Sequence, residues 1–376
     1  MSRPTRILIV NPFGIGDVLF STPLIRAVRR AFPDAHLAYL CNRRTEEILR
    51  RNTNLNELFI YEKDELVALW KRNAFLGLHA ILSLVEQVRR RRFDLAVDLS
   101  LGERFAPILM AMGVSRRVGF NYRNRGRFLT DRLTIEGYHD THVVEYYRRL
   151  LEFIGIRLMD DAGLEVVVSE ADAGWATRWL HECRLEDRRP LVGMVPAGGV
   201  SWGIDAPFRR WSFEGFAQVG DALADRYGAR LILFGEASDR AVCHTVAKLM
   251  RHPAIDLSGQ TTLGQFVSLL GRLQLVLCND GGPLHLAVSQ HVKTVSVFGP
   301  VSPEVYGPYP PDAHRHRVIC YEALPCRPCY HHFKLPPCPY ERACLTMIEP
   351  EEVIAACDAL LDSGPARQAG VLHGRN

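Results

Sequence analysis

The chain has 376 residues, of which 47% are hydrophobic and 23% are charged, a composition typical of globular proteins with large cores. Extended disorder is thereby excluded, and no apolar run reaches the roughly 20 residues that a membrane-spanning helix needs. The net charge of +4 is unevenly spread: residues 1–160 hold 26 Lys and Arg against 18 Asp and Glu, and residues 161–376 hold 20 against 24. The simplest interpretation is a basic front half that faces an anionic partner, although solvated basic faces are common.

Apolar runs alternate with helical patterns through the front half. The predicted strands are 7–10, 37–40, 58–61 and 95–99, and the predicted helices are 21–31, 45–51 and 105–112. Such alternation is typical of a parallel sheet with helices on both faces. The first strand pattern begins almost at once, without a signal-peptide pattern before it, so we expect a cytoplasmic protein.

The turn after the first predicted strand contains Gly14, Gly16 and Asp17. The glycine spacing is that of a dinucleotide-binding turn, but Leu19 stands in place of the third glycine and Asp17 brings a negative charge to the pyrophosphate position. A carboxylate here could instead accept a proton from a substrate hydroxyl, with the glycines leaving space for that substrate. We expect the helix dipole to keep Asp17 ionised and therefore a weak base. The alternative is a plain helix N-cap.

The segment from 66 to 93 combines apolar residues with a run of four arginines at 89–92. One interpretation is a basic amphipathic helix that lies on an anionic membrane surface. The favoured interpretation is a solvated helix end that packs on the core.

The same alternation restarts after residue 188. The predicted strands are 191–195, 230–234, 255–257, 275–278 and 295–298, and the predicted helices are 213–226, 241–250 and 263–270. A connection between 165 and 190, with a helix near 171–183, separates the two halves. The sequence therefore predicts two doubly wound α/β domains with the ligand site in the cleft between them.

Two turns of the rear half carry candidate phosphate-binding residues. Gly198 and Gly199 follow strand 191–195, and small residues there leave backbone donors open to phosphate. Arg209 or Arg210 could neutralise a departing diphosphate, and we expect one of the two to be merely solvated. Glu236 follows the next strand, at an edge where it could bind ribose hydroxyls.

The stretch Asn279-Asp280-Gly281-Gly282-Pro283-Leu284-His285 is the most informative motif. It lies between two apolar runs and predicts a strand, a tight turn and a helix that begins near Pro283. The first N–H groups of such a helix, approached closely through the two glycines, suit an anion. The alternative is an ordinary strand-to-helix turn with a capping Asp.

The ten cysteines divide into two groups. Five are scattered and expected to be reduced. The others cluster between 320 and 344, and Cys326, Cys329, Cys338 and Cys344 could form a zinc site, since Cys-x-x-Cys suits tetrahedral zinc. The favoured alternative is a compact loop packed by reduced thiols and prolines, because the outer spacings match no common zinc module.

Together these motifs resemble glycosyltransferase family 9, the lipopolysaccharide heptosyltransferases. The resemblance rests on 14–17, 209–211, 234–236 and 279–285, and also on 297–300, 306–308, the cysteine-rich segment and 348–353. It implies a GT-B fold, inversion at the anomeric carbon without a metal or other cofactor, and ADP-heptose as the donor.

By position, the resemblance implies that Asp17 is the catalytic base. It implies that the donor is bound by Gly198, Gly199, Arg209, Glu236, Asp280, Gly281, Gly282 and His285. Arg209 stands where a Lys is usual, which keeps the charge but alters the geometry, and Gly281 stands where a Thr is frequent. The expected acceptor is a lipopolysaccharide-core or related glycan on an anionic glycolipid or oligosaccharide.

Acceptor binding is expected at Gly14 and Gly16 and in a basic cluster of the front domain. The cluster comprises Arg116, Arg117, Arg123, Arg125 and Arg127, of which Arg123 and Arg125 are the leading candidates. Phosphates of the acceptor would dock there; the alternative is that the arginines serve only solubility. Peripheral contact with the inner face of the cell membrane is then possible, and no nucleic-acid partner is expected.

The expected domains are an acceptor-binding domain over 1–168, a linker with a helix over 169–189 and a nucleotide-sugar-binding domain over 190–348. A C-terminal helix over 349–363 and a disordered tail over 364–376 complete the chain. Two other functions remain open at this point: a nicotinamide-dependent oxidoreductase that uses the Gly14 turn, and a noncatalytic nucleotide-sugar-binding protein.

Overall fold

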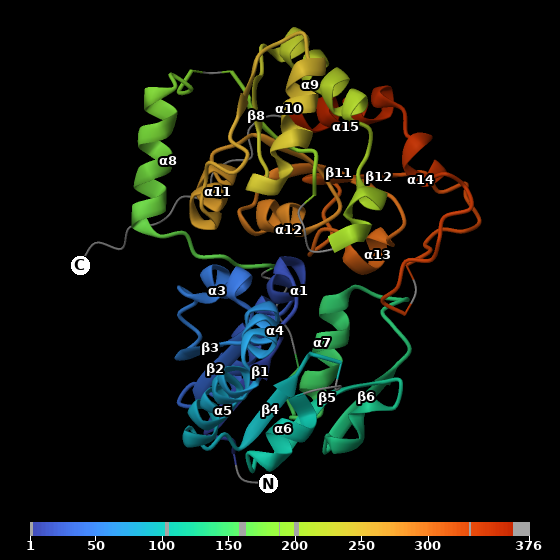
Figure 1. Cartoon of the computed structure of the whole chain (residues 1–376). Coiled ribbons are helices and arrows are strands. Elements are labelled where there is room, and N and C mark those ends of the chain that lie inside the picture. The colour runs from blue at the N-terminus through green and yellow to red at the C-terminus, as the bar shows by residue number, and fades with distance from the viewer. Residues whose placement is uncertain are drawn as a thin grey trace.

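Two parallel six-stranded sheets form the framework of the computed structural model, which describes residues 3–101, 105–157, 163–187, 189–198, 203–330 and 332–363. The front sheet contains β1 (Arg6–Val10), β2 (His36–Cys41), β3 (Glu57–Ile60), β4 (Leu95–Asp98), β5 (Arg116–Tyr122) and β6 (Asp131–Ile135). The rear sheet contains β7 (Leu191–Val195), β8 (Arg230–Leu233), β9 (Ala254–Asp256), β10 (Leu275–Asn279), β11 (Lys293–Phe298) and β12 (His316–Cys320). Figure 1 shows the front domain in blue to green and the rear domain in green to red.

Both sheets have the same doubly wound topology. The strand order is β3-β2-β1-β4-β5-β6 in front and β12-β11-β10-β7-β8-β9 in the rear, so the order reverses between β1 and β4 and between β7 and β10. Ligands of such sheets bind at the carboxyl ends of strands beside these reversals. The predicted α/β fold with two Rossmann-like domains is confirmed.

Three strands were not predicted from the sequence. β5 begins with Arg116-Arg117, β6 reads Asp-Arg-Leu-Thr-Ile, and β12 begins with His316-Arg317. β6 and β12 lie at sheet edges, where polar side chains reach solvent and the apolar run is interrupted.

The front helices largely follow the predicted pattern. They are α1 (Ile15–Phe20), α2 (Thr22–Ala31), α3 (Arg43–Leu49), α4 (Lys63–Arg72), α5 (Ala74–Arg90), α6 (Phe105–Ala111) and α7 (Val143–Glu152). The predicted helix over 21–31 is preceded by a separate short helix, α1, and the break falls at Ser21, whose hydroxyl donates to the Val18 carbonyl. This break lets α1 point from the end of β1 toward the rear domain.

The rear helices cover both faces of the second sheet. They are α8 (Glu170–Glu182), α9 (Phe213–Tyr227), α10 (Arg240–Leu249), α11 (Leu263–Leu270), α12 (Gly282–Ser289), α13 (Pro303–Tyr306), α14 (Ala343–Thr346) and α15 (Pro350–Asp362). Within the described ranges, none of the helices of either domain is both long and apolar enough to cross a lipid bilayer.

One hydrophobic cluster runs through both domains. It joins Leu19 and Tyr147 of the front domain to Leu284 and Phe298 of the rear domain, and all four side chains are buried. α1 and α12 contact each other where the domains meet (Figure 1). The carboxyl-end turns of the two sheets are therefore held face to face by apolar packing.

Candidate active site

A cleft lies beside the α1–α12 contact and is built from the turns that follow β1 and β10. Its volume of about 510 Å³ is in the range of small-molecule sites. The front domain contributes residues 13–17 and Phe20. The rear domain contributes Asp205, Arg209, Asp280, Gly281, Gly282, His285, Val301, Tyr306, Tyr330, Phe333, Lys334 and Leu335.

Asp17 lines the cleft from the first turn of α1. Its carboxylate accepts a hydrogen bond from the Gly14 N–H at 3.3 Å, and its backbone carbonyl accepts one from the Asn11 side chain at 3.0 Å. Burial raises the pKa of Asp17 to about 6, although the Gly14 hydrogen bond and the Arg209 charge oppose the shift. A base with this pKa is half ionised near pH 6 and accepts a proton more readily than an ordinary Asp.

The expectation that the helix dipole keeps Asp17 a weak base is therefore wrong. α1 has only six residues, so its dipole is small, and the loss of water on burial outweighs the hydrogen bond from Gly14 and the charge of Arg209. The alternative, Asp17 as the helix N-cap, is wrong in position: Gly14 is the N-cap, and Asp17 stands three residues later and accepts from the Gly14 N–H.

The glycine pair opens α12 at the opposite side of the cleft. Gly281 is the N-cap with a φ of 154°, and a Cβ there would lie 2.8 Å from the Gly198 carbonyl oxygen. A threonine at this position would therefore clash, which gives a physical reason for glycine here. A Cβ on Gly282 would lie 3.1 Å from the Ile15 side chain of α1. Gly198 supports this turn from behind, and Gly199 lies outside the described residues.

Arg209 and Asp280 form a buried ion pair at the edge of the cleft. The guanidinium lowers the pKa of Asp280, but the loss of water on burial outweighs it and the pKa of Asp280 is raised. Asn279 holds this corner together, because its side chain accepts from the Trp211 N–H at 2.9 Å and donates to the Pro196 carbonyl at 2.7 Å. The segment with Arg209 and the turn after β7 are thus both tied to the end of β10.

Arg210 points away from Arg209. Its Nε donates to the Ala197 carbonyl at 2.8 Å, and its guanidinium lies 3.7 Å from the buried Asp239 carboxylate. The expectation that one of the two arginines is merely solvated is wrong, since both are tied to the protein. Glu236 is exposed at the start of a short helical turn and is not among the residues that line the cleft.

His285 is buried in α12, and its ring packs against Phe20 of α1 with 4.5 Å between ring centroids. Burial and the nearby His142 and Arg209 hold the pKa of His285 well below its usual range, so the ring is neutral. Its Nδ1 has no hydrogen-bond partner among the described residues. The side chain predicted to bind the donor is thus a neutral imidazole.

Residues of the segment 330–335 complete the cleft, and sequence reasoning did not identify them. Tyr330, Phe333 and Lys334 line it, and Phe333 packs on Tyr122 with 5.1 Å between ring centroids. The Tyr122 hydroxyl donates to the His332 carbonyl at 2.8 Å. A rear-domain loop therefore crosses to the front domain. In the sequence, the aromatic and basic residues that follow Cys329 could have indicated that this segment lines a ligand site.

The basic cluster expected in the front domain divides into two groups. Arg123 and Arg125 follow β5 and lie over the Tyr122 ring, at 5.0 Å and 5.9 Å from its centroid. Arg116 and Arg117 lie at the opposite end of β5, where they bond to Asp131 and to the Phe128 carbonyl. Only the first group is beside the cleft, because β5 separates the ends by its full length. Grouping all five arginines into one docking patch was wrong.

The cysteine-rich segment contains no metal-binding arrangement in the part of the chain that is described. No group of three or more His, Cys, Asp and Glu side chains there is placed to hold a metal ion. Cys326 and Cys329 are half-buried, Cys338 is exposed and Cys344 is buried against the rear core. The Cys329 N–H donates to the Pro300 carbonyl at 3.0 Å. The segment thus packs beside the cleft.

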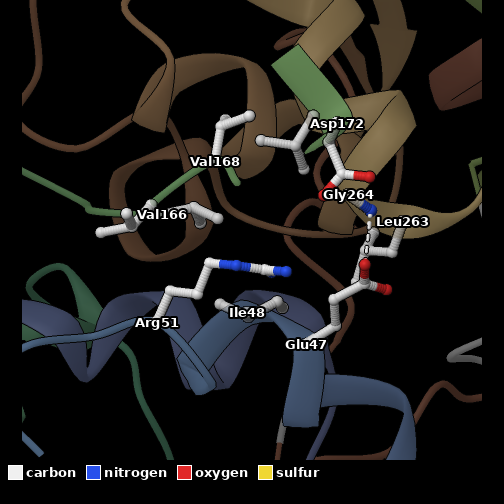
Figure 2. A pocket seen from close by; sticks show the side chains of 10 residues that line it. Glu47, Ile48, Arg51, Val166, Val168, Asp172, Leu263 and Gly264 are labelled. Carbon is white, nitrogen blue, oxygen red and sulfur yellow. Dashed lines mark hydrogen bonds between the residues drawn. The ribbon is translucent and has the colours of Figure 1, made fainter. Parts of the chain in front are cut away.

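A second, small pocket lies where α3, the 166–168 segment and α11 meet. Figure 2 shows Glu47 reaching from α3 to Gly264, with Asp172 on the other side. The Gly264 N–H donates to the Glu47 carboxylate at 3.0 Å. A Cβ on Gly264 would lie 2.6 Å from Glu47 and 2.5 Å from Asp172. This pocket is a joint between the domains and lies apart from Asp17 and Asp280.

The dinucleotide alternative loses its support at the Gly14 turn. A Cβ on Gly16 would lie 3.2 Å from the His285 ring, and Ile15 lies against Gly282. α12 therefore packs against the first turn of α1, where the pyrophosphate of a dinucleotide would bind at this turn.

Comparisons with known proteins point to one family. The sequence model of glycosyltransferase family 9 (heptosyltransferase) matches residues 81–336. Lipopolysaccharide heptosyltransferase 2 of Escherichia coli is 25% identical over 324 residues, 84% of this chain and 87% of that protein.

Solved structures agree with the sequence comparisons. A family 9 glycosyl transferase from Veillonella parvula superposes with a TM-score of 0.80 at 23% identity and covers 97% of this chain and 99% of its own. ADP-heptose lipopolysaccharide heptosyltransferase II of E. coli superposes with a TM-score of 0.71 at 22% identity, covering 95% and 99%. With its two facing Rossmann-like domains and the family match across most of its length, the chain belongs to glycosyltransferase family 9, the heptosyltransferases, and is a glycosyltransferase.

Proposed function

We propose that the protein transfers heptose from ADP-heptose to the core of a lipopolysaccharide acceptor, with inversion and without a metal. The observation that carries this proposal is the position of Asp17, which lines the same cleft as Arg209 and the N-terminus of α12. Asp17 and Arg209 are close enough for the arginine charge to lower the carboxyl pKa. A base and a cation that face one another in one cleft suit the two charges that move in glycosyl transfer.

The donor diphosphate would bind at the glycine pair of α12. The helix N-terminus supplies backbone N–H groups and a positive dipole, and Arg209 supplies a full charge. Asp280 holds the guanidinium in place, and its own carboxylate can accept a hydroxyl of the sugar. As the anomeric carbon–oxygen bond breaks, the electron pair leaves with the ADP phosphate, and these fixed groups stabilise the new charge.

The acceptor hydroxyl would attack from the front-domain side. Asp17 accepts the hydroxyl proton while the oxygen bonds to the anomeric carbon opposite the leaving phosphate, which inverts that carbon. The N–H of Gly14 holds the Asp17 carboxylate in position. Gly14 leaves the turn without a side chain on the path of the acceptor, and Gly16 lines the cleft beside the His285 ring.

The proposal of a lipopolysaccharide acceptor rests on the basic residues near the cleft and on the proteins to which this chain is similar. Arg123, Arg125 and Lys334 lie around the front-domain side of the cleft and suit phosphate groups of a glycolipid. The E. coli relatives are named as lipopolysaccharide and ADP-heptose heptosyltransferases. We therefore place the protein in the cytoplasm, at the inner face of the cell membrane, where both substrates would meet it.

The test combines purified protein, ADP-heptose and a heptose-deficient lipopolysaccharide acceptor. We expect ADP release that depends on the acceptor, persists in excess EDTA, and forms a linkage of opposite anomeric configuration by NMR. Asp17→Asn should lower turnover by about 10²–10⁴-fold with the donor dissociation constant nearly unchanged. Donor binding without transfer would instead support a noncatalytic protein, and ADP release only in the presence of free metal would refute metal independence.

A further inference from the structure

The α4–α5 hairpin of the front domain exposes an unusual number of large apolar side chains. Fifteen large hydrophobic residues are exposed in the described part of the chain, and seven lie on this hairpin. These are Val67, Trp70, Phe75, Leu76, Leu78, Ile81 and Leu82. Phe75 is 83% exposed and Leu82 is 54% exposed, so neither side chain packs on the core. The favoured expectation, a solvated helix end that packs on the core, fits the end of α5, where Val88 is buried and residues 89–92 are exposed, but these seven side chains do not pack there.

The hairpin is a defined structure. Trp70 of α4 lies against Gly77 of α5, where a Cβ would come within 2.8 Å of the Trp70 ring. The Asn73 side chain caps α5 by accepting from the Phe75 N–H at 2.8 Å. The close helix contact and the cap hold the turn in one shape, with Phe75 next to it. The exposed side chains therefore project from a helical hairpin of defined conformation.

The apolar side chains form a stripe with basic residues at both ends. Phe75, Leu78 and Leu82 recur at helical spacing on one face of α5. Lys71 and Arg72 stand just before Phe75, and Arg89 stands seven residues after Leu82. Residues 63–92 hold seven Lys and Arg against three Asp and Glu. Interfacial membrane helices combine an apolar face and basic flanks in this way.

We infer that the α4–α5 hairpin docks the protein on an anionic lipid bilayer. Phe75, Leu78 and Leu82 would enter the headgroup region, while Lys71 and Arg72 contact lipid phosphates. Charge favours this occupant over a second copy of the chain, since a two-fold pairing of this face would bring the same cations together. None of the described residues forms an ion pair with Lys71 or Arg72, so both charges are available to lipid.

Docking through this hairpin would bring the cleft close to a lipid-linked acceptor, and this consequence rests on the proposed function. α4 begins at Lys63, three residues after the carboxyl end of β3, and the carboxyl ends of the front strands face the cleft. α5 ends at Arg90, before the amino end of β4, and so runs away from the cleft. The start of α5, which carries Phe75, thus belongs to the cleft-side part of the hairpin, where docking brings the acceptor-binding turn toward the bilayer. Figure 1 shows α4 nearer to the rear domain than α5.

The experiment measures co-sedimentation of the full chain with vesicles of phosphatidylethanolamine and phosphatidylglycerol, against vesicles of phosphatidylcholine. We expect binding to the anionic vesicles that weakens with salt. The double variant Phe75→Ser/Leu82→Ser should bind at least tenfold more weakly, and so should Lys71→Glu/Arg72→Glu. The control is Leu249→Ser, which removes a leucine that is 45% exposed, against 54% for Leu82, from α10 of the rear domain and should bind as the unaltered protein does.

A second measurement separates this inference from the proposed function. Turnover with a delipidated, soluble acceptor should be the same in the Phe75→Ser/Leu82→Ser variant as in the unaltered protein. Vesicle binding without transfer would overturn the proposed function and leave the docking surface intact. The docking surface is refuted if the folded protein ignores anionic vesicles or if the double variant still binds them. A dimer that the double variant abolishes, without vesicle binding, would assign the face to self-association.

Discussion

The ring of His285 in the rear domain lies against Gly16 in the front domain, so closely that a Cβ on Gly16 would be 3.2 Å from the His285 Cδ2 atom. Next to this contact, a Cβ on Gly282 of the rear domain would lie 3.1 Å from the Ile15 side chain of the front domain. The turns that begin α1 and α12 thus each bring a side chain against a glycine of the other, and the width of the cleft depends on the side chains that these glycines lack.

Gly16→Ala tests this contact. Alanine favours the α1 helix by about 0.5–1 kcal/mol, but its methyl group must push the His285 ring back by a few tenths of an ångström. We expect little change in thermal stability and a roughly tenfold loss of kcat/KM, because the base and the donor turn move apart. The control is Gly174→Ala in α8, whose Cβ would meet only the end of Arg178 at 3.4 Å. It should gain stability and keep its activity; equal behaviour of the two variants would contradict the role of the contact.

The turnover rate should rise with pH through about 6 and then level off. Burial raises the pKa of Asp17 to about 6, and only the ionised carboxylate can accept the acceptor proton. The measurement is kcat/KM for ADP release between pH 5 and pH 8. A rate that is flat across this range would show that Asp17 does not titrate as the base.

Asp17→Asn should also stabilise the fold at neutral pH. The folded pKa of about 6 lies above the usual value of 3.8, so folding favours the protonated carboxyl, and stability falls as pH rises from about 4 to 6. Asparagine removes this penalty, which is on the order of 1–3 kcal/mol above pH 6 and vanishes below pH 4. Chemical unfolding of both proteins at pH 4 and pH 8 measures it. A variant that is less stable at pH 8 would contradict the assigned pKa.

Replacing Arg209 should harm both donor binding and stability. The guanidinium is paired with the buried Asp280, so Arg209→Met leaves an uncompensated carboxylate and costs about 3–5 kcal/mol. Arg209→Lys keeps the charge, and we expect it to retain the fold but to weaken donor binding by about tenfold. Calorimetry with ADP and thermal unfolding measure the two effects. Arg226→Lys is the control, because the Arg226 side chain is exposed and its pair with the half-buried Asp358 should be worth less than about 1 kcal/mol. Equal ADP binding by Arg209→Lys and the unaltered protein would exclude a donor contact.

Glu47 should help to hold the domains together. Its carboxylate accepts the Gly264 N–H across the joint shown in Figure 2. Glu47→Ala removes that bond without touching the cleft, so we expect a larger radius of gyration by X-ray scattering and a higher KM. The neighbouring Glu46→Ala removes only the i,i+4 pair with Arg50 on the same helix and serves as the control. If both variants scatter identically to the unaltered protein, the bond does not contribute to closure.

Local patterns predicted most of the framework of this protein. The strand, turn and helix around Asp280 could be predicted because glycines, a proline and apolar runs impose their structure within a few residues. The same holds for the turn that carries Asp17. The sequence did not predict the polar strand β5 or the edge strands β6 and β12, because their residues lack a continuous apolar run.

Properties that depend on distant segments came only from the tertiary structure. The pKa of Asp17 is raised because folding removes water from its carboxylate, which lies in a cleft lined by residues of both domains. Arg209 pairs with Asp280, whereas Arg210 lies near Asp239, and Phe333 packs on Tyr122. All of these partners come from distant parts of the chain. Neighbouring residues determine backbone conformation, whereas desolvation and side-chain partners are set by which surfaces meet when the two domains pack.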